Sequence, residues 1–375
     1  MNIAMPLIHI GQSSNTLDKE FPLKNTIIIG ERVIGNGAPG YIIAEVAQAH
    51  EGSLGMAHAY IDAAAEVGAD AIKFQTHIAD AESTKDEKFR VQMSGQDATR
   101  FDYWKRMEFT PEQWSGLVQH AKDKNIEFLS SAFSVPAVEL LAKLGMKAWK
   151  VGSGEFRSQE LLNAMIKAGG PVLLSSGMSK NEEVAGAVSY FKKNNVAFGL
   201  FQCTSMYPTP LEKVGINVLA QYKNSFDCPI GLSDHTGMIY PSLMALAQGA
   251  DMLEVHVTFD KRMYGPDVPA SLTFEELKSV AHARDAFHVM NCNPVDKDAM
   301  ADEMSTMRQL FTKSIAFVNP AKKNTVITDD MLTPKKPGTG IPYLERNKVI
   351  GKILTRDVPQ DRLLSWDDIG EEKNA

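Results

Sequence analysis

The chain has 375 residues, of which 44% are hydrophobic and 23% charged, and it carries a net charge of -7. This composition is typical of a globular protein, and the length suits one large α/β barrel of about 250 residues with a small additional domain. The negative charge argues against nucleic acid or an anionic membrane as a general partner, although a single pocket can still be basic. Three scattered cysteines predict neither a disulfide framework nor a structural zinc site. No targeting segment or membrane-length apolar run is present, so we expect a cytoplasmic protein.

The first part of the chain predicts an N-terminal segment, 1–40, that contains a short β-hairpin. A regular alternation of apolar strand-like runs with amphipathic helical patterns then extends over 41–290. The expected strands cover 41–47, 70–75, 127–133, 147–152, 171–176, 197–203, 228–233 and 251–257. Helical patterns stand out at 56–69, 110–124, 135–145, 158–170, 181–195, 240–250 and 272–287. Eight such alternations predict an α/β fold of the (β/α)8 TIM-barrel type, which is the expected catalytic domain.

Two regions depart from this alternation. Residues 76–109, after the second expected strand, are charged and rich in turn formers. Long loops at that end of a barrel strand usually form a lid or a binding loop. Residues 291–314 read as a polar linker, and 315–375 as a small β-rich domain broken by Pro and Gly. Its hydrophobic core is small, so we expect this domain to pack against the barrel or against another subunit.

Polar side chains at the strand ends suggest an anion site. Lys73 and Lys150 each lie within an apolar strand, where a lysine is costly to bury without a partner. Ser153, Ser175 and Ser233 lie beside glycines and offer donors that suit a phosphate group. Each serine taken alone is more often an ordinary turn residue, and each lysine could pair with a barrel carboxylate for purely structural reasons.

Two carboxylates and two histidines complete this set. Glu45 and Glu155 are candidate general acids or bases, or else counter-ions of the lysines. His235 and His256 end adjacent strands, near Asp234 and Glu254, which is a plausible arrangement for a divalent metal. The alternative is that both are structural histidines. On the second strand Lys73, Gln75 and His77 share one parity and are expected to face one side.

These residue types leave three interpretations. A strand lysine, Lys73 or Lys150, could form a Schiff base with a carbonyl substrate, as in a class I aldolase. Alternatively, a metal held by the histidines could polarise an aldehyde while the lysines bind a phosphorylated co-substrate, and the paired histidines favour this reading. A non-catalytic carbohydrate-binding protein based on the C-terminal domain is disfavoured, because a pure binder would not need both histidines and both lysines.

Motifs along the whole barrel resemble those of the N-acetylneuraminate (sialic acid) synthase family. They are IIAEVAQAHEG, IKFQTH, YWKRMEFT, FLSSAFS, WKVGSGE, LLSSGM, QCTSMYPTP, GLSDHTG and GPDVPASL, in that order. KKPGTGI and VIGKILTRDV resemble the family's C-terminal antifreeze-like (SAF) domain, a β-clip fold. The resemblance covers nearly everything after about residue 24.

The resemblance implies condensation of phosphoenolpyruvate with an acetamido-sugar aldehyde, N-acetylmannosamine or a related diacetamido hexose. The product would be a nine-carbon 2-keto-3-deoxy sugar acid, released with phosphate. It also implies a divalent cation, manganese with magnesium or cobalt as alternatives, and a domain-swapped homodimer. By motif position, His235 and His256 would bind the metal. Phosphoenolpyruvate would be held by Lys73, Lys150, Ser153, Ser175 and Ser233. Glu45 and Glu155 would act near the reacting carbons, Gln75 would orient water or metal, and Tyr207 and Asp267 would contact the sugar.

Two positions depart from the family pattern. Ser205 follows Cys-Thr where sialic acid synthases commonly have Asn, so one phosphoenolpyruvate contact is shortened or lost. Lys336 replaces an arginine that in the family reaches from a partner subunit toward the acylamino group of the sugar. A lysine keeps the charge but cannot form two parallel hydrogen bonds. The sequence therefore leaves the sugar open among N-acetylmannosamine, legionaminate-type and pseudaminate-type precursors.

Overall fold

A computed structural model describes residues 25–89 and 96–370 of the chain. The chain divides into two compact units, Met1–Cys292 and Asn293–Ala375. We call them the barrel unit and the C-terminal unit and describe each by itself. No helix within the described residues is both long enough and apolar enough to cross a membrane.

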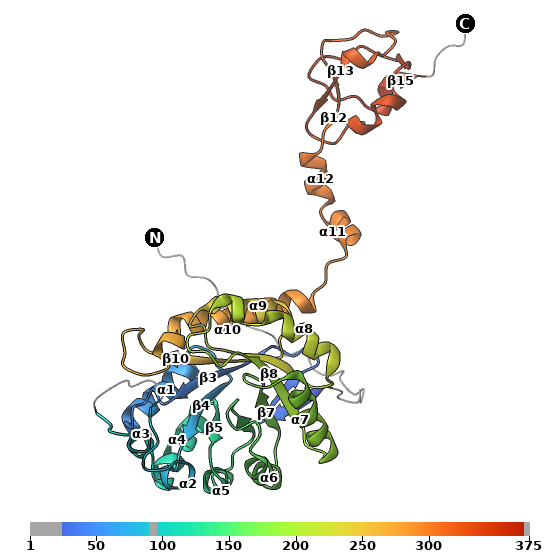
Figure 1. The fold of residues 1–375 in the computed structure, drawn as a ribbon. Coiled ribbons are helices and arrows are strands. Elements are labelled where there is room, and N and C mark those ends of the chain that lie inside the picture. Colours follow the sequence, from blue (N-terminus) through green and yellow to red (C-terminus); the bar gives the residue numbers. More distant parts are fainter. Residues whose placement is uncertain (1–24, 90–95, 371–375) are drawn as a thin grey trace. The chain divides into compact units, whose positions relative to one another are not determined.

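The barrel unit is built on eight parallel strands that close into a ring (Figure 1). Each strand pairs with the next in the chain, and β10 pairs with both β9 and β3, which closes the sheet. The predicted TIM barrel is thus confirmed. The strands are β3 (Tyr41–Ala47), β4 (Ala71–Thr76), β5 (Glu127–Ala132), β6 (Trp149–Val151), β7 (Val172–Ser175), β8 (Phe198–Cys203), β9 (Ile230–Asp234) and β10 (Met252–Thr258).

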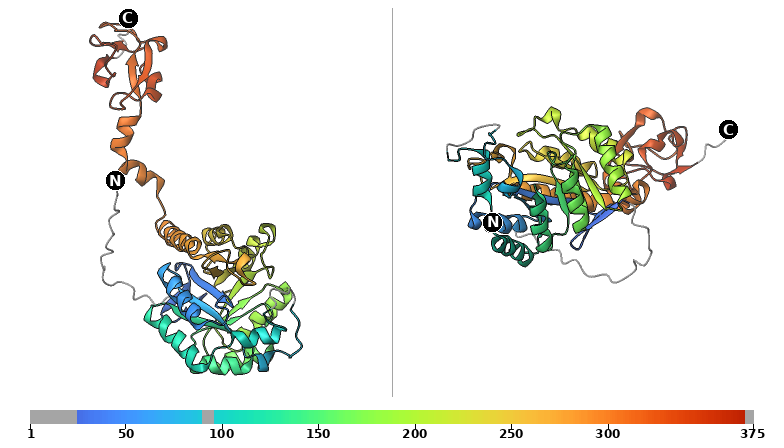
Figure 2. Two further views of the ribbon diagram at one scale, coloured as in Figure 1. Left: turned by 90° about the vertical axis from the view of Figure 1, so that its left-hand side faces the viewer. Right: turned by 60° about the horizontal axis from the view of Figure 1, so that its bottom comes forward.

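Helices surround the strands, as the views in Figure 2 show. The seven expected helices are present as α1 (Leu54–Glu66), α4 (Pro111–Asp123), α5 (Val135–Lys143), α6 (Gln159–Ala168), α7 (Asn181–Lys193), α9 (Ile239–Ala247) and α10 (Phe274–Cys292). The helix between β8 and β9, α8 (Ile216–Ser225), was not recognised in the sequence. Its N-cap is Gly215 in the left-handed conformation, and no side chain caps it, so the usual Ser, Thr, Asp or Asn signal is missing.

The predicted hairpin is confirmed as β1 (Thr26–Ile29) and β2 (Arg32–Gly35), paired antiparallel. Its Ile27, Ile29 and Ile34 are buried in one cluster with inward-facing barrel residues, among them Tyr41 and Met252. These inward residues lie at the N-terminal ends of their strands. The hairpin therefore covers the N-terminal end of the barrel with apolar side chains, which leaves the C-terminal end for polar groups.

The long segment between β4 and β5 contains α2 (Ala79–Glu82) and α3 (Arg100–Met107), and its residues 90–95 lie outside the described part of the chain. Thr99 and Asp102 form a capping box that fixes the start of α3. Arg106 links α3 to the turn that follows β3, because its guanidinium donates to the carbonyl and carboxylate of Glu51, and also to Asp97. The segment is thereby held beside the C-terminal ends of the strands. A two-residue strand, β11 (Leu272–Thr273), pairs with the end of β10.

The C-terminal unit begins with two short helices, α11 (Lys297–Glu303) and α12 (Ser305–Phe311). Two small antiparallel pairs follow, β12 (Ser314–Phe317) with β13 (Leu332–Lys335) and β14 (Ile353–Leu354) with β15 (Ile369–Gly370). Their core is a separate cluster that includes Ile315, Phe317, Ile327 and Leu364. This unit is small and β-rich, as its sequence indicated.

Candidate active site

A cavity of about 490 Å³ opens at the C-terminal ends of the barrel strands. Twelve of the fourteen predicted site residues line it: Glu45, Lys73, Gln75, Lys150, Ser153, Glu155, Ser175, Ser205, Tyr207, Ser233, His235 and His256. Asp267 lies beside it, with Oδ2 3.7 Å from Nδ1 of His256. Lys336 belongs to the C-terminal unit, where its ammonium lies 5.1 Å from the ring centroid of Phe311.

Strand parity explains why these side chains converge. On β4, Ala71 faces the apolar interior beside the hairpin. Lys73 and Gln75 follow on the same side of the strand, closer to its C-terminal end. The intervening Ile72 and Phe74 pack outward against the helices. On β10, Met252, Glu254 and His256 follow the same order. The barrel interior thus changes from apolar to charged along each strand, and the charged level is the floor of the cavity.

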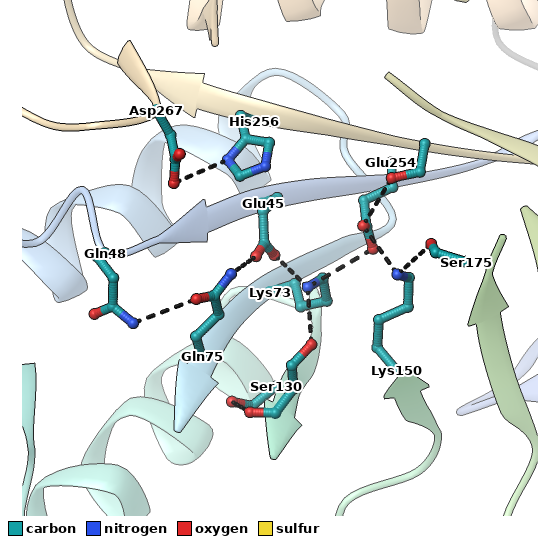
Figure 3. A network of polar contacts seen from close by, with 12 residues as sticks. Glu45, Gln48, Lys73, Gln75, Ser130, Lys150, Ser175, Glu254, His256 and Asp267 are labelled. Carbon is teal, nitrogen blue, oxygen red and sulfur yellow. Dashed lines mark hydrogen bonds and ion pairs between the residues drawn. The ribbon is translucent and has the colours of Figure 1, made fainter. Parts of the chain in front are cut away.

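The floor of the cavity is a network of buried ion pairs (Figure 3). Nζ of Lys73 lies 2.6 Å from Glu45 Oε2 and 3.8 Å from Glu254 Oε2. Nζ of Lys150 lies 3.2 Å from Glu254 Oε1 and donates to Ser175 Oγ at 2.7 Å. Glu45 is therefore a counter-ion of Lys73, and this contact does not exclude its other candidate role as a general acid or base. Glu254, noted in the sequence only as a nearby carboxylate, joins the two lysines.

Burial and the charges of the lysines shift the pKa values of the two carboxyl groups in this network in opposite directions. Burial raises the pKa of Glu45, the nearby Glu254 raises it further, and Lys73 offsets only part of the rise. Burial acts in the same direction on Glu254, but the charges of Lys150 and Lys73 outweigh it and lower its pKa. The pKa of Lys73 is raised, because the two carboxylates outweigh the cost of burying its charge. At neutral pH Glu254 is thus ionised and Lys73 is charged.

The serines surround this charged floor. Ser233 donates to Glu254 at 3.2 Å, and Ser131, which sequence reasoning missed, accepts from Lys73 at 3.2 Å. Ser131 has the same strand parity on β5 as Leu129, which faces the barrel interior, and this parity was the signal available in the sequence. Ser153 and Ser205 converge on Gly177, where an added Cβ would lie 2.3 Å from the Oγ atom of each. Glycine at 177 therefore keeps space open between these two hydroxyls.

His235 and His256 lie side by side, with ring centroids 5.3 Å apart. Burial lowers the pKa of His235 to about 4 and that of His256 well below its ordinary value, so both rings are neutral at pH 7. Nδ1 of His235 contacts the carbonyl of Thr204 at 3.1 Å, and its Nε2 faces the Tyr207 hydroxyl at 3.0 Å. Nδ1 of His256 is buried and has no hydrogen-bond partner within the described residues.

These two neutral imidazoles fit a divalent cation, because a neutral ring nitrogen is a metal ligand and one here is unsatisfied. No group of three or more His, Cys, Asp or Glu residues in the described chain is arranged to hold a metal. Asp234, expected nearby, is not among the residues that line the cavity, and its carboxylate accepts from Thr236 instead. Further ligands would have to come from water or substrate.

The segment between β4 and β5 adds residues that the sequence did not single out as functional. Trp104 of α3 and Phe133 after β5 stack on the two faces of the His77 ring, with centroid distances of 3.9 and 4.4 Å. Glu82 of α2 contacts Nδ1 of the same ring at 2.5 Å. Glu155 is half-buried at the cavity wall, and burial, then the charge of Glu82, raises its pKa.

The closed barrel, the charged floor and the paired histidines define a TIM-barrel protein with a candidate active site at the C-terminal ends of its strands. Comparison with known proteins identifies the family. The NeuB family model matches residues 60–293, and the SAF domain model matches residues 312–370. The chain belongs to the NeuB family and carries a C-terminal SAF domain, as its motifs indicated.

Named relatives make the class more definite. The chain is 32% identical to N,N'-diacetyllegionaminic acid synthase of Campylobacter jejuni, over 86% of this chain and 98% of the relative. It is 33% identical to human N-acetylneuraminate-9-phosphate synthase, over 88% and 92% of the two chains. The crystal structure of N-acetylneuraminic acid synthetase from Leptospira borgpetersenii, in complex with citrate, superposes with a TM-score of 0.67. That structure is 30% identical and covers 76% of this chain and 96% of its own. The chain is thus an enzyme of the nonulosonate synthase class.

Proposed function

We propose that this enzyme condenses phosphoenolpyruvate with an acetamido-sugar aldehyde to give a nine-carbon 2-keto-3-deoxy sugar acid and phosphate. One observation carries the proposal: two buried lysines, Lys73 and Lys150, form the floor of the cavity with serine hydroxyls around them. Such a floor suits a small ligand with more than one negative charge. Phosphoenolpyruvate, with a carboxylate and a phosphate on three carbons, has that charge and size.

The chain's own groups account for binding this substrate. Oε2 of Glu254 is buried and accepts no hydrogen bond within the described residues, although Lys73 lies 3.8 Å away. Lys150 and Lys73 can therefore direct N–H donors of their ammonium groups toward an incoming anion. Glu254 meanwhile keeps both ammonium groups charged and in position. Ser153, Ser175, Ser205 and Ser233 add hydroxyl donors around the same floor. We assign contacts with the sugar to Tyr207, which is half-exposed at the cavity mouth, and to Asp267, which lies beside His256.

The groups of the enzyme have two protons to move. The enol carbon of phosphoenolpyruvate forms a bond with the aldehyde carbon, and the aldehyde oxygen takes up a proton. Water then adds at the second carbon and loses a proton. When the C–O bond to phosphate breaks, the new hydroxyl becomes the keto oxygen and its proton leaves with the phosphate. Glu45 and Glu155 line the cavity, and burial raises the pKa of both, so each holds a proton to higher pH than an exposed glutamate does. We assign the two proton transfers to this pair, with Gln75 beside Glu45 orienting water.

His235 and His256 are the residues that would hold a divalent cation, manganese in the first place, or magnesium or cobalt. Such an ion supplies Lewis-acid polarisation of an aldehyde oxygen. The neutral rings and the unsatisfied Nδ1 of His256 support this assignment.

A Schiff-base aldolase is the competing enzyme class, and the charge state of Lys73 disfavours it. A lysine must lose its proton to attack a carbonyl, whereas the neighbouring carboxylates raise the pKa of Lys73. Lys150 is likewise ion-paired, 3.2 Å from Glu254. Trapping of a lysine by borohydride in the presence of pyruvate, together with indifference to chelator, would favour the aldolase.

The deciding experiment uses full-length protein stripped of metal by a chelator. It is incubated with phosphoenolpyruvate and N-acetylmannosamine, with and without manganese, and phosphate release and product mass are followed. We expect metal-dependent release with a nonulosonate product. Phosphate release only with a diacetamido-trideoxyhexose would support the same reaction and identify that sugar, in place of N-acetylmannosamine, as the substrate. Failure with every aldehyde would overturn the proposal.

We also propose a cytoplasmic homodimer in which the C-terminal unit of each subunit covers the barrel mouth of its partner. Four large apolar side chains in α12 and at its N-cap support this, because Met304, Met307, Leu310 and Phe311 are each at least half exposed. Light scattering of the purified protein tests the assembly. A monomer at micromolar concentration would contradict it.

A further inference from the structure

We propose that His77 is a positioning residue that carries a proton on both ring nitrogens and thereby fixes the amide of Gln75, with its NH2 group on Glu45. The inference follows from the hydrogen-bond partners of three consecutive polar groups. They run from Glu82, on the segment between β4 and β5, through His77 and Gln75 to Glu45 on the cavity floor.

The orientation of Gln75 is set first by Glu45. Nε2 of Gln75 lies 3.0 Å from Glu45 Oε1. Oε2 of the same group lies 2.6 Å from the ammonium of Lys73, so Glu45 is here the ionised counter-ion of that lysine. A carboxylate can only accept, so the NH2 group of the amide must face it. The amide oxygen of Gln75 then faces the other way, where Nε2 of Gln48 donates to it at 3.4 Å. Glu45 thus sets the orientation of the Gln75 amide, and Gln48 follows it.

The orientation of the Gln75 amide decides whether one ring nitrogen of His77 carries a proton. Its Nε2 lies 3.3 Å from the amide oxygen of Gln75, which is an acceptor. An unprotonated Nε2 would point its lone pair at the lone pairs of the Gln75 amide oxygen. Turning the amide would remove that repulsion, but its oxygen would then face the carboxylate of Glu45. Nε2 of His77 therefore carries a proton and donates it to Gln75.

The other nitrogen of His77 faces a second carboxylate. Nδ1 contacts Oε1 of Glu82 at 2.5 Å, and Oε2 of Glu82 accepts from the backbone of Ile78 at 3.4 Å. Protons on both nitrogens make the ring an imidazolium with Glu82 as its counter-ion. Trp104 and Phe133 stack on its two faces within 13° of parallel, and aromatic faces stabilise an enclosed cation. The charge of Glu82 also acts on a further carboxyl group of the cavity wall, because it contributes to the raised pKa of Glu155.

The consequence for the reaction is positional. An imidazolium at 77 holds Gln75 against Glu45, and Glu45 in turn lies 2.6 Å from Nζ of Lys73. His77 touches this machinery through Gln75, so its loss should lower turnover more than substrate binding. The kinetic part of this inference rests on the proposed function, whereas the protonation state of His77 does not.

The first test is NMR of the full chain labelled with ¹⁵N-histidine. The chain has nine histidines, and His77→Phe, which preserves the aromatic stack, assigns the His77 signals by their loss. From the hydrogen-bond partners of the ring we expect a proton on both nitrogens of His77 at about pH 7. A bare Nε2 on His77 at that pH would overturn the inference, whatever the enzyme's activity.

The second test is Glu82→Gln, which removes the counter-ion. We expect His77 to hold one proton, kcat to fall about tenfold, and KM for phosphoenolpyruvate to change by less than about twofold. Asp80→Asn is the matched control, because Asp80 is an exposed carboxylate of the same helix that pairs with Lys105. An equal fall in both variants, or a singly protonated His77 in wild type, would contradict the inference. Should wild type itself release no phosphate while His77 is doubly protonated, the proposed function fails and the inference stands.

Discussion

Both units of the molecule bury charged side chains, but they use them differently. In the C-terminal unit the carboxylate of Asp368 is fully buried and accepts from Arg362, from the Ser365 backbone and hydroxyl, and pairs with Arg356 at 3.1 Å. Its partners enclose it. In the barrel unit, Glu254 keeps a buried oxygen without a hydrogen bond, and the lysines it holds line a cavity.

The comparison shows that a buried charge alone does not identify a functional site. Asp368 is satisfied by groups close to it in sequence and closes a turn. The charges of the barrel come from different strands, remain incompletely satisfied and face a space that a ligand can enter. Incomplete satisfaction beside a cavity is therefore the informative feature.

The largest expected effect is the loss of a lysine from the barrel network. Lys150→Met should lower turnover about 10³-fold, because it removes a buried donor for the anion and leaves Glu254 with a weaker counter-charge. Steady-state phosphate release measures this. Lys167→Met, on the exposed side of α6, should behave as wild type. A Lys150→Met enzyme with more than a tenth of wild-type turnover would refute the anion site.

Glu155→Gln sharpens the comparison within the cavity. Turnover should fall about 100-fold, whereas binding of phosphoenolpyruvate should change little, since the amide cannot exchange a proton but keeps the shape. Kinetics together with calorimetric binding separate the two effects. Glu139→Gln, exposed on α5, serves as the control. Unchanged turnover would remove Glu155 from the mechanism.

In the C-terminal unit the corresponding substitution should affect stability instead. Asp368→Asn should lower the free energy of unfolding of that unit by about 3 kcal/mol, because the amide cannot satisfy both arginines and the Ser365 donors. Urea unfolding of the full chain measures it. Asp361→Asn is the control, since Asp361 is exposed and pairs weakly with Lys335, at 3.4 Å. A loss below about 0.5 kcal/mol would mean that the buried carboxylate is not structural.

The smallest effect concerns pH. Burial lowers the pKa of His50 to about 3, whereas an unfolded histidine titrates near 6.5. Below pH 6.5 the unfolded chain binds a proton that the folded chain excludes, so stability falls as pH falls. At pH 5 the loss from this residue is about 2 kcal/mol. Urea unfolding of wild type and His50→Gln at about pH 7 and 5 tests this, because contributions of His235 and His256 cancel between them. Equal pH slopes in the two proteins would contradict it.

The barrel, its eight strands and most of the side chains that face the cavity could be predicted from the sequence. Apolar runs of strand length fixed the strands, and the two-residue period of a strand placed Lys73, Gln75 and His77 on one side. The same period placed Glu254 and His256 together. Local periodicity was sufficient here, because a closed parallel barrel brings the C-terminal ends of all its strands together. The helix at 216–225 was missed, since a left-handed glycine starts it without a capping side chain.

Tertiary structure decided the pairings. Lys73 meets Glu45 across adjacent strands, but Lys150 meets Glu254 from strands that are not neighbours. Ser131 and the Glu82–His77 contact likewise depend on how a strand and a long connecting segment approach the cavity. Asp234 and Glu254 are both acidic in sequence, yet one is satisfied by Thr236 and the other joins two lysines. Partner choice depends on distances across the barrel, and spacing along the chain does not encode those distances.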